Sequence, residues 1–178
     1  MIYAKIDDEN SKIVIEGIQK SAKNMSKPMR KIANMLENSV KENFDVGGRY
    51  SSPGSIMGGD KKWMAPKYPV SKGKTLDRTG MLKNSIEGDG TNKEAIVSTG
   101  IVYAAIHNFG GKTKAHKIVG RNSHKKKLKF TTSTGSILFR SSVNHPGSKI
   151  DARPFMVIQQ EDIDIAKEMI SNHILKKD

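Results

Sequence analysis

The sequence predicts an α+β domain, with N-terminal helices and a C-terminal helix packed on a mainly antiparallel β-sheet and a basic β-hairpin insertion. Two observations predict this class. Apolar residues recur at helical spacing near both ends of the chain, whereas the middle holds strand-like alternation separated by turn residues. The length of 178 residues fits a single domain over 1–178, containing a long Gly/Pro/Ser loop at 45–75 and a basic insertion at 112–149.

The N-terminal region predicts one strand followed by helices. Residues 1–7 alternate apolar and polar side chains, as a half-buried strand does. Helical spacing then continues past Pro28, so we expect two consecutive helices or one long helix kinked at this proline. Ser26 is the expected N-cap of the second helix. The two apolar stripes consist of Ile15, Ile18, Ala22 and Met25, and of Met29, Ile32, Leu36, Val40 and Phe44.

Residues 45–75 form the expected long loop. They hold three of the six prolines of the chain and show no persistent hydrophobic period. A loop this long inside a domain is usually functional. Trp63 is the only tryptophan, and it either pins the loop to the core or forms a hot spot on the surface.

Short elements are expected between the loop and the basic insertion. Thr79 is the predicted cap of a short helical segment. A glycine-rich stretch over 88–92 signals a turn between strands near 84–87 and 94–99. Residues Ile101–Phe109 fit either a strand or a helical turn, which Gly110 and Gly111 then end.

The basic insertion carries most of the net charge of +13. Ten of the 31 lysines and arginines lie in 112–149 with no Asp or Glu, whereas the rest of the chain carries 21 basic residues against 18 acidic ones. Alternation over 128–132 and 136–140 around a Thr-Gly turn predicts a hairpin, to which 115–119 adds a third strand. Three readings remain open for its lysines: contact with nucleic acid, docking on an acidic neighbouring protein, or a solvated hairpin whose charges prevent edge aggregation.

The C-terminal region predicts an extended segment and a helix. Pro154 disfavours helix before it, so 150–158 is expected to be extended. Ile163, Ala166, Ile170 and Ile174 then recur at helical spacing. Acidic residues at the start of this helix and lysines at its end complement the helix dipole.

No catalytic or metal-binding motif is found. Without cysteine the chain has no disulfide, thiolate metal site or Cys nucleophile, and its five histidines lack metal-ligand spacing. His107 close in space to Asp77 or Asp151 would make a base with its orienting carboxylate, but a structural role for this histidine is favoured. We therefore expect no enzyme and no cofactor. The start of the chain lacks the apolar core of a signal peptide, and no apolar run approaches the length of a membrane span.

Four ordered sequence blocks resemble the phage virion morphogenesis family, the tail-completion proteins typified by those of Mu-like phages. Each block alone is a weak signal, but their order, between a helical beginning and a helical end, is specific. The blocks are Asp60-Lys61-Lys62-Trp63, then Leu76-x-x-Thr79-Gly80-x-Leu82-x-x-Ser85-Ile86, then Val97-x-Thr99-Gly100-x-x-Tyr103-Ala104-x-Ile106-His107-x-Phe109-Gly110-Gly111, and finally Ala152-Arg153-Pro154-Phe155.

The resemblance implies a non-enzymatic protein that acts late in tail assembly or in head–tail joining, as a homo-oligomer or ring. Its expected partners are phage tail or head–tail connector proteins, in the host cytoplasm during assembly and in the virion tail, with no membrane contact. The alternative is a basic nucleic-acid-binding protein that uses the 112–149 insertion. The expected partner-binding residues are Trp63, Arg121, Lys125, Lys126, Lys127, Lys129, Arg140 and Arg153.

The remaining motif residues are assigned structural roles. The glycines are expected in tight turns or at positive φ, and the aromatic and aliphatic residues are expected to pack against the helices. Arg153 is expected to pair with a carboxylate or carbonyl at a subunit boundary, and Phe155 to anchor the chain before the last helix. The structural set is Leu76, Thr79, Gly80, Leu82, Gly100, Tyr103, Ala104, Ile106, His107, Phe109, Gly110, Gly111, Pro154 and Phe155.

Overall fold

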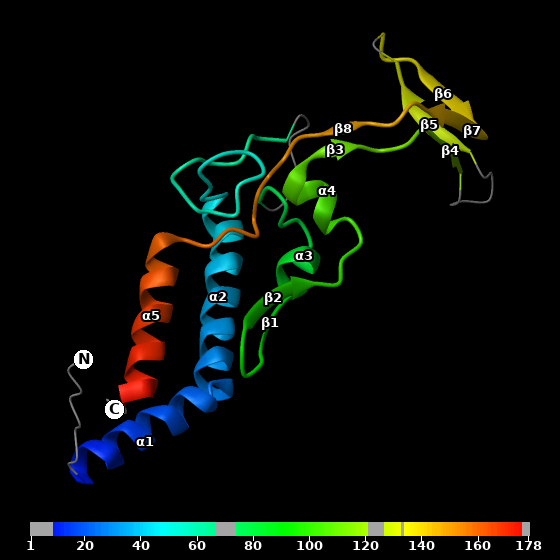
Figure 1. Ribbon diagram of the computed structural model, residues 1–178. Helices are drawn as coiled ribbons and strands as arrows, with labels where there is room; N and C mark the ends of the chain where they lie inside the picture. Colours follow the sequence, from blue (N-terminus) through cyan, green and yellow to red (C-terminus); the bar gives the residue numbers. More distant parts are fainter. Residues whose placement is uncertain (1–8, 67–73, 121–126, 133, 176–178) are drawn as a thin grey trace, which may run out of the picture.

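The computed structural model describes residues 9–66, 74–120, 127–132 and 134–175. It confirms the α+β class: along the sequence, helices at both ends of the chain flank a set of antiparallel strands. The molecule is elongated, with the helices at one end and two strand pairs projecting at the other (Figure 1). The strand expected over 1–7 lies outside the described residues.

The N-terminal region forms two helices, α1 (Glu9–Lys23) and α2 (Ser26–Val46). The break lies at Asn24 and Met25, before Pro28, and the expected cap at Ser26 is wrong. Met25 occupies the N-cap position, and its N–H donates to Oδ1 of Asn92 at 2.6 Å. Asn92 also donates to the carbonyl of Lys23 at 2.9 Å. A side chain distant in sequence therefore satisfies both helix ends at the break, a role that local capping rules cannot anticipate.

The strands β1 (Ile86–Gly90) and β2 (Ala95–Thr99) form an antiparallel hairpin against α2. The turn expected over 88–92 is therefore wrong in its first half, since Gly88 and Gly90 belong to β1. A Cβ on Gly88 would overlap the carbonyl of Ala33, and one on Gly90 would overlap the backbone of Arg30. These glycines allow strand and helix backbones to approach closely, rather than forming a turn.

Side-chain contacts reinforce this packing of helix on hairpin. Glu37 on α2 accepts hydrogen bonds from Lys41 at 2.6 Å and from the N–H of Gly88 at 2.8 Å. The bond from Lys41, followed by that from Gly88, lowers the pKa of the Glu37 carboxyl below its ordinary value. The ionised carboxylate therefore links α2 to the middle of β1.

Two short helices lie in the motif region. Helix α3 (Met81–Asn84) begins after Gly80, which is its N-cap and has a φ of 72°. The cap expected at Thr79 is therefore wrong. Helix α4 (Ala104–Phe109) decides the open choice at 101–109 in favour of a helical turn, and Gly110 ends it with a φ of 75°. Gly100 does not have the positive φ that was one of its two expected roles, and the space around it is open.

The other strands pair two by two and do not form the single sheet that was expected. Three antiparallel pairs complete the fold within the described residues: β3 (Gly111–Lys112) with β8 (Lys149–Ile150), β4 (His116–Val119) with β7 (Ser142–His145), and β5 (Leu128–Thr131) with β6 (Ile137–Arg140). The segment at 115–119 thus pairs with β7 instead of adding a strand to β5 and β6.

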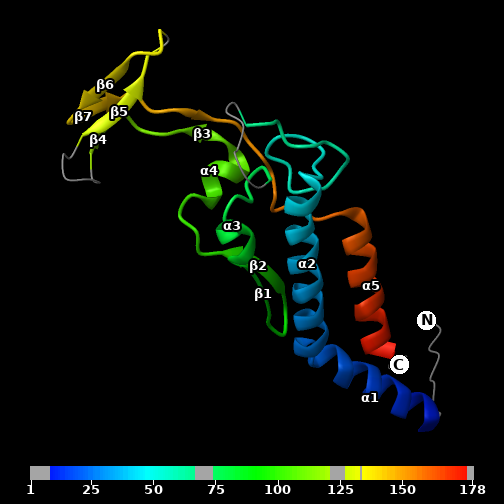
Figure 2. The same cartoon turned by 180° about the vertical axis from the view of Figure 1, so that it is seen from behind.

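The C-terminal helix α5 (Gln160–Leu175) packs on α2 and α1 instead of on a sheet. Figure 2 shows α5 on one side of α2 and the β1–β2 hairpin on the other. At the far end of α5, Nε2 of His173 lies 2.8 Å from the carbonyl oxygen of Asn24 at the α1–α2 break. Helix α2 is therefore the central element, covered on both sides.

The core lies at the C-terminal end of α2. Phe44 meets Trp63 edge-on at 5.5 Å between ring centroids and Phe155 at 5.2 Å. The neighbouring buried side chains are Val40, Tyr50, Leu82, Ile86, Ala104 and Val157. This core therefore joins α2, the long loop, the motif region and the segment before α5.

Substituting Phe155 tests whether this cluster holds the fold together. Phe155→Ala removes a fully buried ring between Phe44 and its neighbours, so we expect unfolding to become about 3–5 kcal/mol easier, from lost burial and a residual cavity. Phe109→Ala is the matched control, because this motif aromatic is 63% exposed, and a change within about 0.5 kcal/mol is expected. Urea denaturation measures both, and equal losses would contradict this core.

A pair of glycine substitutions tests the close approach of α2 and β1. Gly90→Ala places a methyl group against the backbone of Met29 and Arg30, and an overpacked contact of this kind costs about 1–3 kcal/mol. Gly100→Ala adds the same methyl group where nothing lies within 4 Å, and it is expected to be neutral or stabilising. Thermal unfolding compares the two variants. A Gly90→Ala protein as stable as Gly100→Ala would disprove the close packing.

Candidate interaction surface

The basic insertion at 112–149, hereafter the arm, begins as one continuous ribbon. Lys112 pairs with Lys149 and His116 with His145, so β3–β8 and β4–β7 share a single register. Between these pairs, Thr113 and Ser148 exchange hydrogen bonds of 2.9 and 2.7 Å. The ribbon starts at Gly110, where a Cβ would press on the backbone of Ala152. Only a residue without a side chain leaves room there for the segments that enter and leave the arm to lie side by side.

The register changes in the outer part of the arm. Val119 pairs with Ser142, whereas Leu128 pairs with Arg140, so β5–β6 does not continue the register of β3–β8 and β4–β7. Strands β5 and β6 pair antiparallel, and the N–H of Thr132 donates to the carbonyl of Ser136 at 2.8 Å just past the end of the pair. Arg121, Lys125 and Lys126, which were expected to bind a partner, lie outside the described residues.

Alternation divides the side chains of the β5–β6 pair between two faces. Residues directly opposite one another share a face. Lys129 faces Phe139 and Thr131 faces Ile137, and these four residues are defined here as the outer face. Phe139 is 58% exposed and Ile137 51% exposed, so this pair displays aromatic and aliphatic surface beside a lysine. The opposite face holds Leu128, Phe130, Leu138 and Arg140.

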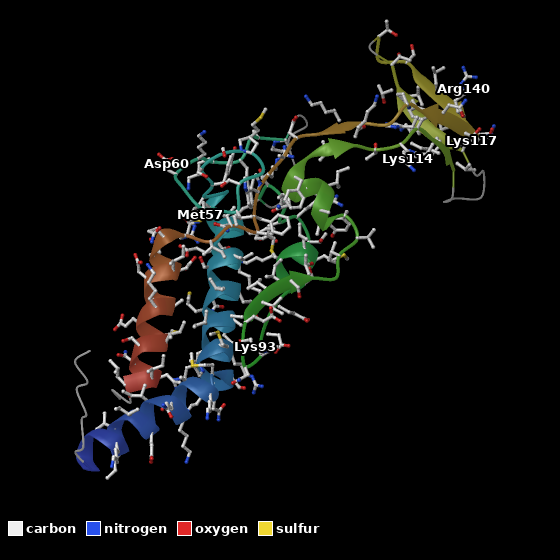
Figure 3. All side chains as sticks on the ribbon, in the orientation of Figure 1. Met57, Asp60, Lys93, Lys114, Lys117 and Arg140 are labelled. Atoms are coloured by element: carbon white, nitrogen blue, oxygen red, sulfur yellow. The ribbon has the colours of Figure 1, made fainter. Side chains whose placement is uncertain are left out.

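The described cations of the arm have no ion-pair partner in the part of the chain that the structure describes. Among the described residues no carboxylate lies within ion-pair distance of an arm lysine or arginine, and the insertion itself has no Asp or Glu. Lys117 on β4, Arg140 on β6 and Lys114 between β3 and β4 project outward from the ribbon (Figure 3). The end of the arm therefore combines exposed apolar surface with positive charge that has no partner.

Trp63 and Arg153, expected among the partner-binding residues, lie buried at the base of the arm. The indole N–H of Trp63 donates to the carbonyl of Pro154 at 2.8 Å, which settles the open choice in favour of pinning the loop to the core. Nε of Arg153 donates to the carbonyl of Met64 at 3.1 Å, within the same chain. A carbonyl partner, as expected for Arg153, is thus present within the chain.

Buried polar residues that sequence reasoning missed hold the segment after the arm. Asn43 on α2 donates to the carbonyl of Phe155 at 2.8 Å, and Oδ1 of Asn108 accepts the N–H groups of Phe155 and Met156 at 3.0 Å. One signal was available for Asn43. It lies beside Val40 and Phe44 on the apolar stripe of α2, where a polar side chain requires a buried partner.

A second buried network fixes the start of α5. Oδ2 of Asp162 accepts the hydroxyl of Ser39 at 2.6 Å and the N–H of Gln159 at 2.8 Å, which is the return bond of a capping box. Arg49 donates to the carbonyl of Ser39 at 2.8 Å and to Oδ1 of Asn43 at 3.0 Å. The direction in which the chain enters α5 is therefore determined by α2.

The motif aromatics do not all pack against the helices as expected. Tyr103 is 40% exposed and Phe109 63% exposed, because α4 is short and buries Ala104 and Asn108 instead. Ile106 is half-buried beneath Gly111. Leu76 adopts a φ of 62°, which is unusual for a residue with a side chain.

His107 lacks the partner that a catalytic base needs. Its buried Nδ1 has no hydrogen-bond partner in the described part of the chain, so neither Asp77 nor Asp151 orients it. Burial, and then the positive charge of Arg153, lower the pKa of His107 below its ordinary value. The imidazole is therefore neutral at neutral pH, and its backbone carbonyl accepts the N–H of Arg153 at 2.8 Å.

Within the described residues no group of three or more His, Cys, Asp or Glu side chains is arranged to hold a metal ion. No helix there combines the length and apolar character that crossing a membrane requires.

Comparison with known proteins places these features in a family. The family model described as the phage virion morphogenesis family matches residues 6–175. The Mu-like prophage FluMu G protein 2 of Haemophilus influenzae is 42% identical over 84 residues, which cover 47% of this chain and 51% of that protein. The matched region thus spans about half the length of that relative, and no solved structure matches the chain. Because the family model extends over the helices, the motif region and the arm alike, the chain belongs to the phage virion morphogenesis family.

Proposed function

We propose that this protein acts in tail completion or head–tail joining, without catalysis, and that the outer part of its arm is the surface that contacts other virion proteins. Membership of a virion morphogenesis family supports the general role. The observation that supports the arm as the contact surface is its exposed Ile137 and Phe139 beside Lys129. Solvent-exposed apolar surface of this kind marks an interaction site.

The composition of the outer face favours a protein partner over nucleic acid. Phosphate binding requires cations, and the arm has ten, but an aliphatic side chain such as Ile137 gains nothing from phosphate. Single-stranded nucleic acid stacks on aromatic rings, and Phe139 is the only one on this face. An apolar centre with charges around it is the usual anatomy of a protein interface.

The chemistry of the arm also specifies what its partner must present. Uncompensated lysines require carboxylates opposite them, and the exposed rings and aliphatic groups require an apolar patch. We infer an acidic and partly apolar surface on a tail or head–tail connector protein. Such contacts would form in the host cytoplasm during assembly and persist in the virion tail.

Substituting the outer face tests this function. In a phage lacking the gene, Ile137→Ser with Phe139→Ser is expected to lower the yield of infectious particles by about a hundredfold while leaving tail components intact, because the loss of two buried anchors costs several kcal/mol of contact energy. Val102→Ser is the matched control, since Val102 is 98% exposed but lies outside the arm. Circular dichroism verifies that the variants fold.

A DNA-binding assay distinguishes the proposed protein contact from the alternative, a basic nucleic-acid-binding protein. The wild-type protein is expected to show no retention of duplex DNA at physiological salt. Salt-dependent DNA binding that is lost in a Lys127→Ser, Lys129→Ser, Arg140→Ser variant, together with full infectivity of the apolar variant, would overturn the proposed protein contact in favour of a basic nucleic-acid-binding protein.

A further inference from the structure

The outward side of α5 carries carboxylates around an exposed apolar residue. Glu161, Asp164, Ile165 and Glu168 recur at spacings of three and four residues and form one stripe, defined here as the acidic stripe. All four are exposed, including 41% of Ile165. Lys167 pairs with Asp164 at 3.1 Å and, with Gln160, holds the pKa of that carboxyl below its ordinary value. Asp164 is therefore ionised at neutral pH.

The acidic stripe has the inverse pattern of the outer face of the arm. The stripe places Ile165 among three carboxylates, of which Glu161 also pairs with Arg49 at 3.5 Å and Asp164 with Lys167 at 3.1 Å. The outer face places Ile137 and Phe139 beside Lys129, with Lys127 just before it in the chain. Contact between the two would bury apolar surface on both sides and bring lysines to carboxylates. Complementarity of this kind fixes the register of an interface and suppresses incorrect partners.

The two surfaces cannot meet within one chain. The arm and α5 lie on opposite sides of α2 in both views of the molecule (Figures 1 and 2). The chain that leaves the arm is fixed to the core by Arg153, whose N–H donates to the carbonyl of His107 and whose Nε donates to the carbonyl of Met64. Helix α5 is fixed to α2 by the hydrogen bond between Ser39 and Asp162. The acidic stripe that receives an arm must therefore belong to another molecule.

We propose that the arm of one copy docks on the acidic stripe of a second copy, so that successive copies join head to tail. This inference rests on the proposed function of the arm as a contact surface and names one partner for it. The contact uses different surfaces on the two molecules, so it repeats from copy to copy. A repeated contact of this type closes into a ring or extends as a filament.

The absence of native cysteine makes the contact directly measurable. Phe139→Cys chains are mixed with Ile165→Cys chains under mild oxidation, and a covalent heterodimer is expected because a disulfide requires two Cα atoms within about 7 Å. A mixture of Val102→Cys with Ile165→Cys chains is the matched control. A chain carrying both Phe139→Cys and Ile165→Cys should give higher covalent multimers. Crosslinking no greater than in the control would overturn the inference.

Charge reversal provides a second readout by analytical ultracentrifugation. Lys127→Glu with Lys129→Glu, or Glu161→Lys with Glu168→Lys, is expected to raise the dissociation constant of self-association about tenfold or more, and mixing the two reversed chains is expected to restore association. Lys93→Glu and Glu94→Lys, at the exposed β1–β2 turn, are the controls and should change little. Lys93 lies at the tip of that turn, far from the arm (Figure 3).

The outcomes separate this inference from the proposed function. If arm substitutions abolish infectivity while crosslinking and self-association remain at control levels, the arm has a different acceptor, which overturns the inference and leaves the proposed function standing. If Phe139→Cys and Ile165→Cys chains crosslink efficiently but the arm substitutions leave infectivity unchanged, docking between copies is supported and the proposed function of the arm fails.

Discussion

The fold depends on how the extended segment between the arm and α5 is held. Residues 152–159 belong to no ladder of strands, yet they run through the most buried part of the molecule, where an unpaired backbone group costs free energy. Side chains from three separate elements supply the missing partners: Asn43 from α2, Trp63 from the loop and Asn108 from α4. Each of these elements is thereby placed relative to the others, and the aromatic cluster around Phe155 fills the space they enclose.

This arrangement separates the molecule into a part concerned with stability and a part available for contact. The buried polar groups around Asn43 and Asp162 are satisfied inside the chain and leave little for a ligand. The arm has the opposite character, with exposed rings and unpaired cations held on a two-stranded ribbon. A ribbon of two strands gains little stability by itself. Covering its apolar side chains with a partner would add the stabilisation that packing against a further strand or a helix normally provides.

Much of the fold could be predicted from periodicity, whereas the contacts between elements could not. The helical stripes predict α2 and α5 because an amphipathic pattern reports which side of a helix is buried. The break before Ser26 and the entry into α5 depend on Asn92, Ser39 and Asp162, whose partners lie far away in the sequence. For the same reason Trp63 and Arg153 were expected on a surface. The sequence around an aromatic ring or a guanidinium does not indicate that its hydrogen-bond acceptor is a carbonyl far away in the chain. The register of β5 and β6 determines which side chains share the outer face, and only the structure gives that register.

The continuity of β8 with the segment that follows it has a mechanical consequence. Strand β8 ends at Ile150, and two residues later the chain enters the run from Ala152 to Phe155, whose backbone is anchored to α2, α4 and the loop. Tension applied at the end of the arm is therefore transmitted along the backbone into the most firmly anchored residues of the molecule. Such a load would be shared among the helices, since all of them are attached at that point or through α2.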